Sequence, residues 1–238
     1  EAIRQLVLRV ALSASMLASA GIARPERPGT SAALPNDGTA VPGLPAVPAA
    51  PGAPSGPAAP FRPGQPIGDP ITLDRPVFIV SSPRAGSTML FEALCRAAEA
   101  VSIGGESHQL IEAIPALAPA AHDWSSNRLT ADDVNPGIVQ QLSGSFVRRL
   151  KNRDGEPVAP GSTVRMIEKT PKNSLRIPFL AAAYPDAKFV YLWRDPRETI
   201  SSMLDAWRSG QFVTYPELPE WTGDRWSLLL TPEWRELI

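Results

Sequence analysis

The sequence contains very little cysteine and histidine. Of its 238 residues, one is a cysteine, Cys95, and two are histidines, His108 and His122. A single cysteine excludes an intramolecular disulfide and a cysteine-rich metal site, and two histidines argue against a histidine-based metal centre. We therefore expect no metal in this protein, and we interpret Cys95 as a small core residue.

The chain also lacks an excess of charge of either sign. It has 23 basic and 24 acidic residues, a formal net charge of −1, and 43% hydrophobic residues. This composition is ordinary for a globular protein and lacks the basic excess that is typical of nucleic-acid-binding proteins. We therefore expect no nucleic-acid partner.

Proline is abundant, but its distribution is uneven. Thirteen of the 27 prolines lie between Pro25 and Pro70, among alanine and glycine and with almost no large apolar residues. Such a segment cannot bury enough apolar surface to offset the entropy lost on ordering. We predict a disordered linker over residues 24–72 and a folded domain over residues 73–238. Such a linker would suit attachment to an upstream fused domain.

Residues 1–23 are apolar, and the sequence leaves their role open. Their apolar side chains recur near helical spacing, which favours an amphipathic helix. Ala18-Ser-Ala20 imitates a secretory cleavage site, and the last helix of an upstream domain is a third interpretation. The apolar run is short for a membrane span. We expect a cytoplasmic location, with a signal or an anchor at this end as the alternative.

The most informative segment is a strand-like run followed by a tight loop of small residues. Val77 to Val80 is β-branched and apolar, Ser81-Ser-Pro83 ends the run, and a helix-like pattern follows Gly86. Strand, loop and helix in this order direct backbone N–H groups and a helix N-terminus at an anion. We therefore predict a phosphate or sulfate site. Its candidate residues are Arg84, Ala85, Gly86, Ser87 and Thr88.

This loop is not the phosphate loop of nucleoside-triphosphate-binding proteins. In the pattern G-x-x-x-x-G-K-[ST], the first glycine would fall on Ser81 and the lysine on Ser87. The segment Pro83-Arg-Ala-Gly-Ser-Thr88 instead resembles the 5′-phosphosulfate loop of sulfotransferases. It is similar to the arginine form of the tyrosylprotein type, whereas cytosolic sulfotransferases carry lysine at the position of Arg84.

A second strand and helix further along the chain follow the same plan. Residues 188–193 predict a buried strand, and residues 196–209 predict a helix. Asp195 is a good N-cap for that helix, Pro196 suits its first position, and Glu198 completes a capping box.

Two residues of this second unit extend the resemblance. Arg194 and Ser202, spaced as Arg-x7-Ser, resemble the sulfotransferase element that holds the 3′-phosphate of 3′-phosphoadenosine 5′-phosphosulfate (PAPS). Two motifs in the right order make the resemblance fairly specific, and it covers about residues 73–238. It implies that PAPS is the co-substrate.

Strands and helices alternate through this domain. The predicted strands are 77–82, 100–103, 163–168 and 188–193, and the predicted helices are 86–99, 107–114, 131–150, 172–183 and 196–209. This alternation predicts an α/β fold, a P-loop-like three-layer domain with a central parallel sheet flanked by helices. Ligands of such sheets gather outside the carboxyl ends of the strands, where the candidate residues fall.

Glu106 follows two glycines at the end of a short predicted strand. Glycine lets a backbone approach a ligand closely, so this carboxylate is a candidate general base. Gly104-Gly-Glu106 resembles the segment that carries the catalytic glutamate of tyrosylprotein sulfotransferases, although Ser107-His108 departs from the residues that follow it there. His108 is the alternative base. A helix cap or a surface ion pair is the structural alternative for Glu106.

Lys169 ends another predicted strand, directly before Thr170-Pro171. Many sulfotransferases have a lysine before a Ser/Asp/Thr-Pro pair, and the resemblance implies a cation beside the leaving group. A solvated lysine at a strand end is the alternative. We interpret Thr170 as a helix N-cap and Glu168 and Lys172 as helix-end charges. The aromatic residues of the C-terminal tail are interpreted mainly as packing residues.

Together these motifs predict a PAPS-dependent sulfotransferase. The sulfuryl group would move to a hydroxyl acceptor by in-line displacement, with Glu106 as base and Lys169 and Arg84 neutralising the leaving group. The acceptor (carbohydrate, peptide, lipid or polyketide-type) and the oligomeric state stay open.

Two other functions remain alternatives at this point. One is an ATP-dependent P-loop-like kinase. The other is a non-catalytic nucleotide-binding fragment, because sulfotransferase domains usually continue for many more residues and we expect this domain to be incomplete at its C-terminus.

Overall fold

The computed structural model of the chain describes residues 7–9, 70–223 and 225–237. The chain divides into two compact units, and the described residues belong to the unit formed by Glu1–Ala11 and Gly68–Ile238. The fold below is that of this unit.

The two N-terminal predictions fall almost entirely outside the described residues. Of residues 1–23, the structure describes Val7–Arg9, which form a β-strand where apolar spacing favours a helix. Of the predicted linker 24–72, it describes the last three residues, which lead into a strand at Thr72–Leu73. The predicted boundary between linker and domain, at residue 73, falls within this strand.

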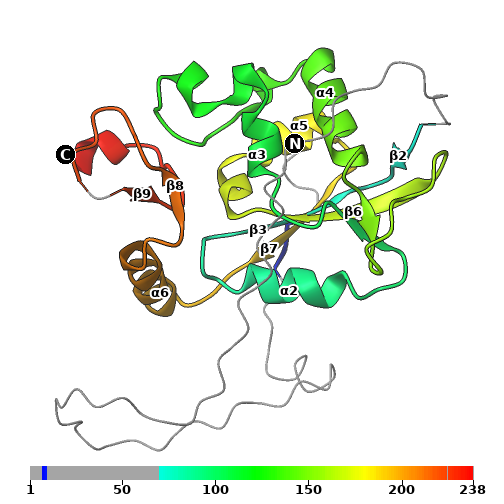
Figure 1. Cartoon of the computed structure of the whole chain (residues 1–238), viewed down its shortest axis with the longest axis horizontal. Helices are drawn as coiled ribbons and strands as arrows, with labels where there is room; N and C mark the ends of the chain where they lie inside the picture. Colours follow the sequence, from blue (N-terminus) through cyan, green and yellow to red (C-terminus); the bar gives the residue numbers. More distant parts are fainter. Residues whose placement is uncertain (1–6, 10–69, 224, 238) are drawn as a thin grey trace, which may run out of the picture. The chain divides into compact units, whose positions relative to one another are not determined.

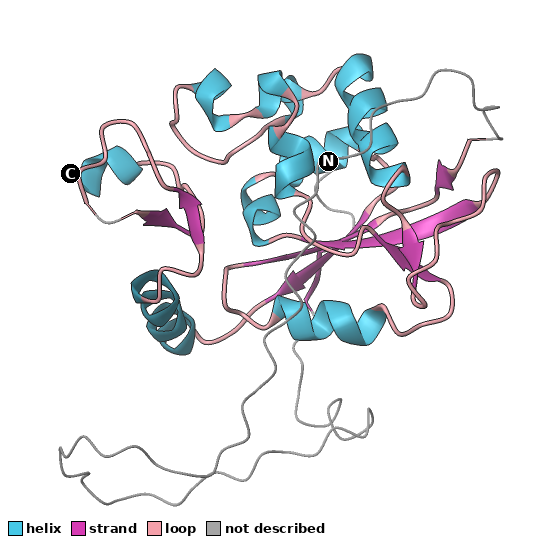
Figure 2. Cartoon of the chain, viewed as in Figure 1, coloured by secondary structure: helices cyan, strands magenta, loops and turns pink. Residues whose placement is uncertain are grey.

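The centre of the unit is a mostly parallel β-sheet (Figures 1 and 2). Four strands lie side by side and pair in parallel, in the order β7 (Lys188–Leu192), β3 (Val77–Ser81), β6 (Thr163–Lys169), β4 (Ala100–Ser102). Three short strands extend them: β1 (Val7–Arg9) beside β7, β2 (Thr72–Leu73) beside β6, and β5 (Lys151–Asn152) antiparallel to β4. The predicted parallel sheet is confirmed.

Helices cover both faces of this sheet (Figure 1). On one face lie α3 (His108–Glu112), α4 (Pro136–Val147) and α5 (Ile177–Ala183), and on the other lies α2 (Ser87–Leu94). α6 (Pro196–Arg208) follows β7. Short 3₁₀ helices complete the unit: η2 (Pro115–Leu117), η3 (Pro119–His122), η4 (Ala131–Asp133), η5 (Pro171–Leu175) and η6 (Trp234–Leu237). The predicted three-layer α/β architecture is thereby confirmed.

The predicted helices differ from the observed ones at their ends, and proline explains two of the differences. Proline has no N–H group, so a helix can begin at proline but rarely continues through it. The predicted helix 131–150 is therefore η4 followed by α4, which begins at Pro136 with Asn135 accepting a 3.0 Å hydrogen bond from the Ile138 N–H. The predicted helix 172–183 is likewise η5 followed by α5, which has Pro178 in its first turn.

The main core lies between the sheet and helices α3, α4 and α5. Its fully buried side chains come from β3, β6, α4 and α5, and they include Phe78, Met166, Leu142, Phe146, Phe179 and Leu180. The Phe78 ring contacts those of Tyr184 and Phe189 at centroid distances of 5.7 and 5.6 Å. Burial of these large side chains supplies most of the favourable free energy of folding.

The C-terminal segment forms a second apolar cluster. The hairpin of β8 (Val213–Tyr215) and β9 (Trp226–Ser227) packs with Trp234, and the rings of Trp226 and Trp234 lie 5.5 Å apart at their centroids. Asn127 ties this segment to the rest of the unit, because it donates its N–H to the Leu230 carbonyl and accepts the Leu230 N–H, both at 2.7 Å. The tail aromatics thus serve packing, as predicted.

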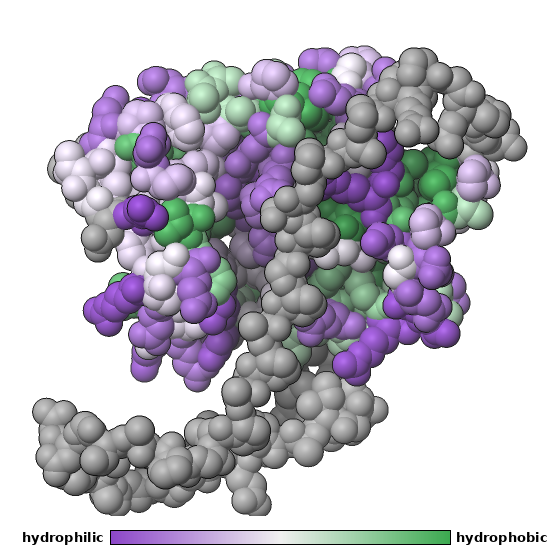
Figure 3. Space-filling model, viewed as in Figure 1, coloured by the Kyte–Doolittle hydropathy of each residue, from purple (hydrophilic) through white to green (hydrophobic). Residues whose placement is uncertain are grey.

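Some large apolar side chains stay at the surface. The most exposed are Trp193 at 63%, Ile200 at 56% and Met89 at 55%. In the face drawn in Figure 3, apolar residues form small patches among hydrophilic ones, as is ordinary for a protein surface. Among the described residues, none of the helices combines the length and the apolar character needed to cross a membrane.

The core predicts how one substitution changes stability. Phe146 is fully buried, so Phe146→Ala should leave a cavity and lower the free energy of unfolding by about 3–5 kcal/mol. Leu94, 37% exposed on α2, offers a control in which Leu94→Ala should cost less than about 1 kcal/mol. Urea denaturation followed by circular dichroism measures both. Equal losses in the two variants would contradict this assignment of the core.

Candidate functional site

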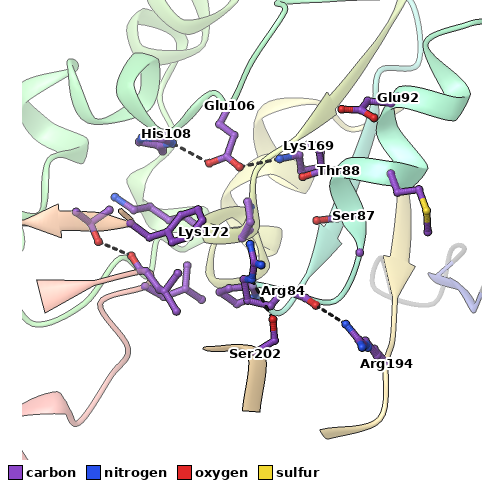
Figure 4. Close-up of a pocket in the computed structure, with 18 of the residues that line it drawn as sticks. Arg84, Ser87, Thr88, Glu92, Glu106, His108, Lys169, Lys172, Arg194 and Ser202 are labelled. Atoms are coloured by element: carbon purple, nitrogen blue, oxygen red, sulfur yellow. Dashed lines mark hydrogen bonds and ion pairs between the residues drawn. The ribbon is translucent and has the colours of Figure 1, made fainter. Parts of the chain in front are cut away.

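A cavity of about 610 Å³ opens where the parallel strands end (Figure 4). Its walls come from the segments that follow β3, β4, β6 and β7, and from α2, α6 and the β8–β9 hairpin. Eight of the nine predicted site residues line it: Arg84, Gly86, Ser87, Thr88, Glu106, Lys169, Arg194 and Ser202. The ninth, Ala85, is buried and is not among the lining residues. The sheet therefore brings almost the whole predicted set together.

The predicted anion loop has the backbone that such a loop requires. Gly86 has a φ of 98°, a conformation that glycine adopts without strain, and α2 begins at the next residue. Arg84 also has a positive φ, 65°, which is unusual for a residue with a side chain. Because the first N–H groups of a helix have no partner within the helix, the start of α2 can receive an anion in the cavity.

The two predicted phosphate-binding motifs touch each other. The Arg84 Nε donates to the Ser202 Oγ over 3.1 Å, and an Arg194 terminal nitrogen donates to the Arg84 carbonyl over 3.2 Å. The Arg84 guanidinium also lies 5.1 Å from the ring centre of Phe212 on the β8 side. Residues more than a hundred positions apart therefore form one basic wall of the cavity.

Arg194 is held by the helix that follows it, α6. Its guanidinium forms an ion pair with Glu198, one turn into α6, at 2.9 Å. Asp195 caps α6 as predicted, by accepting the Arg197 N–H at 2.8 Å. Glu198, predicted to complete a capping box, thus serves to orient Arg194.

Glu106 lies between two cationic or polar partners, as Figure 4 shows. Its Oε1 accepts a 2.7 Å hydrogen bond from the Lys169 Nζ, and its Oε2 lies 3.3 Å from the His108 Nδ1. The Lys169 side chain is only 8% exposed, whereas that of Glu106 is 35% exposed and faces the cavity. The solvated-lysine interpretation is therefore wrong.

The surroundings of Glu106 keep it ionised. Burial raises the pKa of its carboxyl, but interactions with His108 and Lys169 outweigh that effect and hold the pKa below its ordinary value. A carboxylate that is ionised at neutral pH and reaches a cavity has the charge and the position to accept a proton.

The part of the chain that the structure describes holds no group of three or more histidine, cysteine, aspartate or glutamate residues arranged to bind a metal ion. The polar groups around the cavity are instead suited to anions, with three lysine or arginine side chains at its walls besides Lys172.

Comparison with known proteins agrees with this geometry. A model of the sulfotransferase family matches residues 76–231, a range that contains both predicted phosphate-binding motifs and the Glu106–Lys169 pair. The chain belongs to the sulfotransferase family.

The chain also resembles a protein of the nematode Caenorhabditis briggsae. That protein is named "Putative protein-tyrosine sulfotransferase" and is 30% identical over 133 residues. The match spans 54% of this chain and 42% of the relative's length. The chain thus matches less than half of that relative.

A buried carboxyl that sequence reasoning misjudged lies behind the Glu106–Lys169 pair. Glu168 is fully buried at the end of β6, and its oxygens accept hydrogen bonds from Thr170, Ser107 and Asn173. It is therefore not a helix-end charge. Thr170 uses its hydroxyl in this cluster, and its side chain caps no helix.

Lys172 was equally misjudged, since it belongs to a second buried cluster beside the cavity. Its Nζ donates to the Glu112 carboxylate at 2.9 Å and to the Tyr215 hydroxyl at 2.9 Å, and Arg176 donates to the same carboxylate at 2.6 Å. The mixture of charged and small polar residues along 168–176 could have suggested a buried polar turn, but the partners on α3 and β8 are far away in the sequence.

Besides the basic wall and the side with the Glu106–Lys169 pair, the cavity has a third wall, whose residues give no indication of function in the sequence. This wall consists of apolar residues in or next to the β8–β9 hairpin, together with the first residue of η5: Phe212, Val213, Leu228, Leu229 and Pro171. Thr214 also lies there, but its hydroxyl donates to the Leu228 carbonyl at 2.7 Å. Such residues look like ordinary core residues in a sequence, and only the folded chain places them at the cavity.

The Glu112 cluster predicts a pH-dependent stability. Burial raises the pKa of Glu112, but Lys172 and Arg176 outweigh it and lower the pKa below its ordinary value. A depressed carboxyl pKa stabilises the fold above the unfolded-state pKa of about 4.3, and this contribution disappears as the pH falls through the folded-state pKa.

We expect Glu112→Gln to lower the free energy of unfolding at pH 7 by about 3–5 kcal/mol, because two buried cations lose their counter-ion. The difference from the unsubstituted chain should shrink as urea denaturation is repeated from pH 5 to pH 3. Glu99→Gln, at an exposed position, is the control and should change little. A Glu112→Gln deficit that persists undiminished at pH 3 would contradict the predicted linkage.

Proposed function

We propose that this member of the sulfotransferase family transfers a sulfuryl group from PAPS to a hydroxyl acceptor. One observation carries the proposal: a single cavity is lined by the Arg84 loop, by Arg194 and Ser202, and by the Glu106–Lys169 pair. An anion site, a second basic site and a base beside a buried cation are the three parts that this reaction needs.

The donor would occupy the basic wall of the cavity. The N–H groups at the start of α2, with Ser87, Thr88 and Arg84, would hold the 5′-phosphosulfate. Arg194 and Ser202 would hold the 3′-phosphate. In the structure Arg84 is hydrogen-bonded to Ser202, and Arg194 is hydrogen-bonded to the Arg84 carbonyl, so the two basic groups are already held next to each other at one wall of the cavity, which supports a site for two phosphate groups.

The reaction would be an in-line displacement at sulfur. The acceptor oxygen forms a bond to sulfur while the bond from sulfur to the bridging phosphate oxygen breaks, and Glu106 accepts the hydroxyl proton. Negative charge develops on the departing 5′-phosphate, where Lys169 and Arg84 stabilise it. Most of the rate acceleration would come from positioning and charge, as in phosphoryl transfer.

The apolar third wall favours an acceptor hydroxyl on an apolar body. The polar groups at this wall and beside it are already occupied, because Thr214 is bonded to Leu228 and the neighbouring Lys172 to Glu112 and Tyr215. A sugar would bury several hydroxyl groups there without partners, at a cost of about 1–3 kcal/mol each. The name of the nematode relative makes a tyrosyl peptide the first acceptor to test.

The donor site can be tested without knowing the acceptor. Isothermal titration calorimetry should show that the chain binds 3′-phosphoadenosine 5′-phosphate, and that Arg84→Ala and Arg194→Ala each weaken binding at least tenfold, because a charge-assisted bond to phosphate contributes about 1.5–3 kcal/mol. Arg208→Ala, at the exposed end of α6 outside the cavity, is the matched control and should bind normally.

Two results would speak against this donor. Tighter binding of ATP–Mg²⁺ than of 3′-phosphoadenosine 5′-phosphate would favour the kinase alternative. Absence of binding by either ligand, with the fold intact, would favour a non-catalytic chain.

The base can be tested by a conservative change. Glu106→Gln keeps the size of the side chain but cannot accept the proton, so transfer of radioactive sulfate from PAPS to a tyrosyl peptide or an aliphatic alcohol should fall about 10²–10⁴-fold. Affinity for 3′-phosphoadenosine 5′-phosphate should stay within a few-fold, since Glu106 takes no part in the proposed donor contacts. A fully active Glu106→Gln chain would rule out this role and direct attention to His108.

A further inference from the structure

The carboxyl of Glu168 is fully buried and takes no part in the reaction proposed above. It is nevertheless linked to both sides of the Glu106–Lys169 pair. Lys169 follows it on β6, and Ser107, which follows Glu106, donates to it. Polar groups this deeply buried are costly unless hydrogen bonds satisfy them, so their arrangement is strongly specified.

The contacts of Glu168 join three separate segments. Its Oε1 accepts the Thr170 hydroxyl at 2.5 Å and the Ser107 N–H at 3.3 Å, and its Oε2 accepts the Asn173 side-chain amide at 2.9 Å. The loop after β4, the end of β6 and the helix η5 are therefore bonded to one carboxyl group.

Further hydrogen bonds close this cluster. The Ser107 N–H also donates to the Thr170 Oγ1 at 2.7 Å, and the Asn173 amide donates to the Ser107 Oγ at 3.2 Å. Ser107, Glu168, Thr170 and Asn173 are all less than 1% exposed. The Ser107 backbone thus has two fixed acceptors, and this leaves the preceding residue, Glu106, little freedom to move.

We propose that Glu168 is a positioning residue whose buried carboxyl locks the Glu106-bearing loop onto the strand end that carries Lys169. The catalytic meaning of this lock rests on the proposed function. Its physical basis is independent of that function: a loop containing Gly104-Gly105 has little stiffness of its own, and the carboxyl supplies the missing constraint.

The proposal explains why a carboxyl is used although its burial is unfavourable. Burial raises the pKa of Glu168, and the hydrogen bonds from Thr170, Ser107 and Asn173 oppose this rise without cancelling it. A carboxyl has two acceptor oxygens about one bond length from a common carbon, so it can hold the loop and η5 at once. A single hydroxyl could not span both partners.

The position of Glu106 can be measured directly through its titration. In the unsubstituted chain, His108 and Lys169 lower the pKa of Glu106. NMR of the chain labelled with ¹³C at the glutamate carboxyl carbons, with the Glu106 signal assigned from Glu106→Gln, reports this pKa without any acceptor. If the lock is released, the pKa should rise toward the ordinary value of about 4.3.

We expect Glu168→Ala to raise the Glu106 pKa to this ordinary value. Thr170→Val, which keeps the shape and removes one hydroxyl, should shift it part of the way and serves if Glu168→Ala fails to fold. Glu168→Gln should keep the Glu106 pKa of the unsubstituted chain, because glutamine can accept from Thr170 and Ser107 and, once the Asn173 amide turns over, donate to the Asn173 Oδ1, which is buried without a partner in the unsubstituted chain.

Phe146→Ala controls for a general loss of stability, since it destabilises the core without touching this cluster. It should leave the Glu106 pKa unchanged. The proposal is overturned if the Glu106 pKa is the same in the unsubstituted, Thr170→Val and Glu168→Ala chains, or if Phe146→Ala shifts it equally.

Calorimetry separates this proposal from the function on which it rests. Affinity of Glu168→Ala for 3′-phosphoadenosine 5′-phosphate should stay within about threefold of the unsubstituted chain, because Glu168 is not a proposed donor contact. A shifted Glu106 pKa in a chain that never binds the nucleotide would support the lock and reject the donor. Normal binding of the nucleotide with an unshifted Glu106 pKa would support the donor and reject the lock.

Discussion

The parallel pairing of β3 with both β6 and β7 is the constraint on which the site depends. Phe78 is in register with Glu168 on one side and with Phe189 on the other, so the three strands end at the same edge of the sheet. Parallel strands need long crossover connections, and these bring together residues that are distant in the chain. The loop after β3, the turn after β6 and the start of α6 therefore meet around one cavity.

The charges at this edge are arranged as mutually satisfied pairs. Lys169 is paired with Glu106 and Arg194 with Glu198, while Arg84 is hydrogen-bonded to Ser202. The three cations Lys169, Arg194 and Arg84 all line the cavity, so an anionic ligand can compete for them without a large rearrangement. The Glu106–Lys169 pair matters most, because the same cation that keeps the carboxylate ionised also lies where negative charge would develop in the proposed reaction.

Two buried polar clusters support this edge from behind. One surrounds Glu168, and the other surrounds Glu112 with Lys172, Arg176 and Tyr215. The second cluster also reaches the C-terminal hairpin, since Asn127 donates to the Tyr215 hydroxyl at 2.5 Å and is bonded to Leu230. The apolar wall of the cavity is thereby connected to the polar interior. Such buried networks favour one arrangement, because displacing a hydrogen-bonded member would leave further buried groups without partners.

The sequence alone was enough to predict the alternation of strands and helices, an anion loop at Arg84–Thr88, the Arg194–Ser202 motif and the candidacy of Glu106 and Lys169. These features are local: hydrophobic period, turn residues and short spacings reveal them. The folded chain was needed to see that Glu168 and Lys172 are buried, that Thr170 bonds to Ser107 and caps no helix with its side chain, and that Phe212 and Leu229 line the cavity. Burial and long-range partners depend on how strands pair in space. The residue type of a charged or apolar position does not reveal which distant residue will contact it in the folded chain.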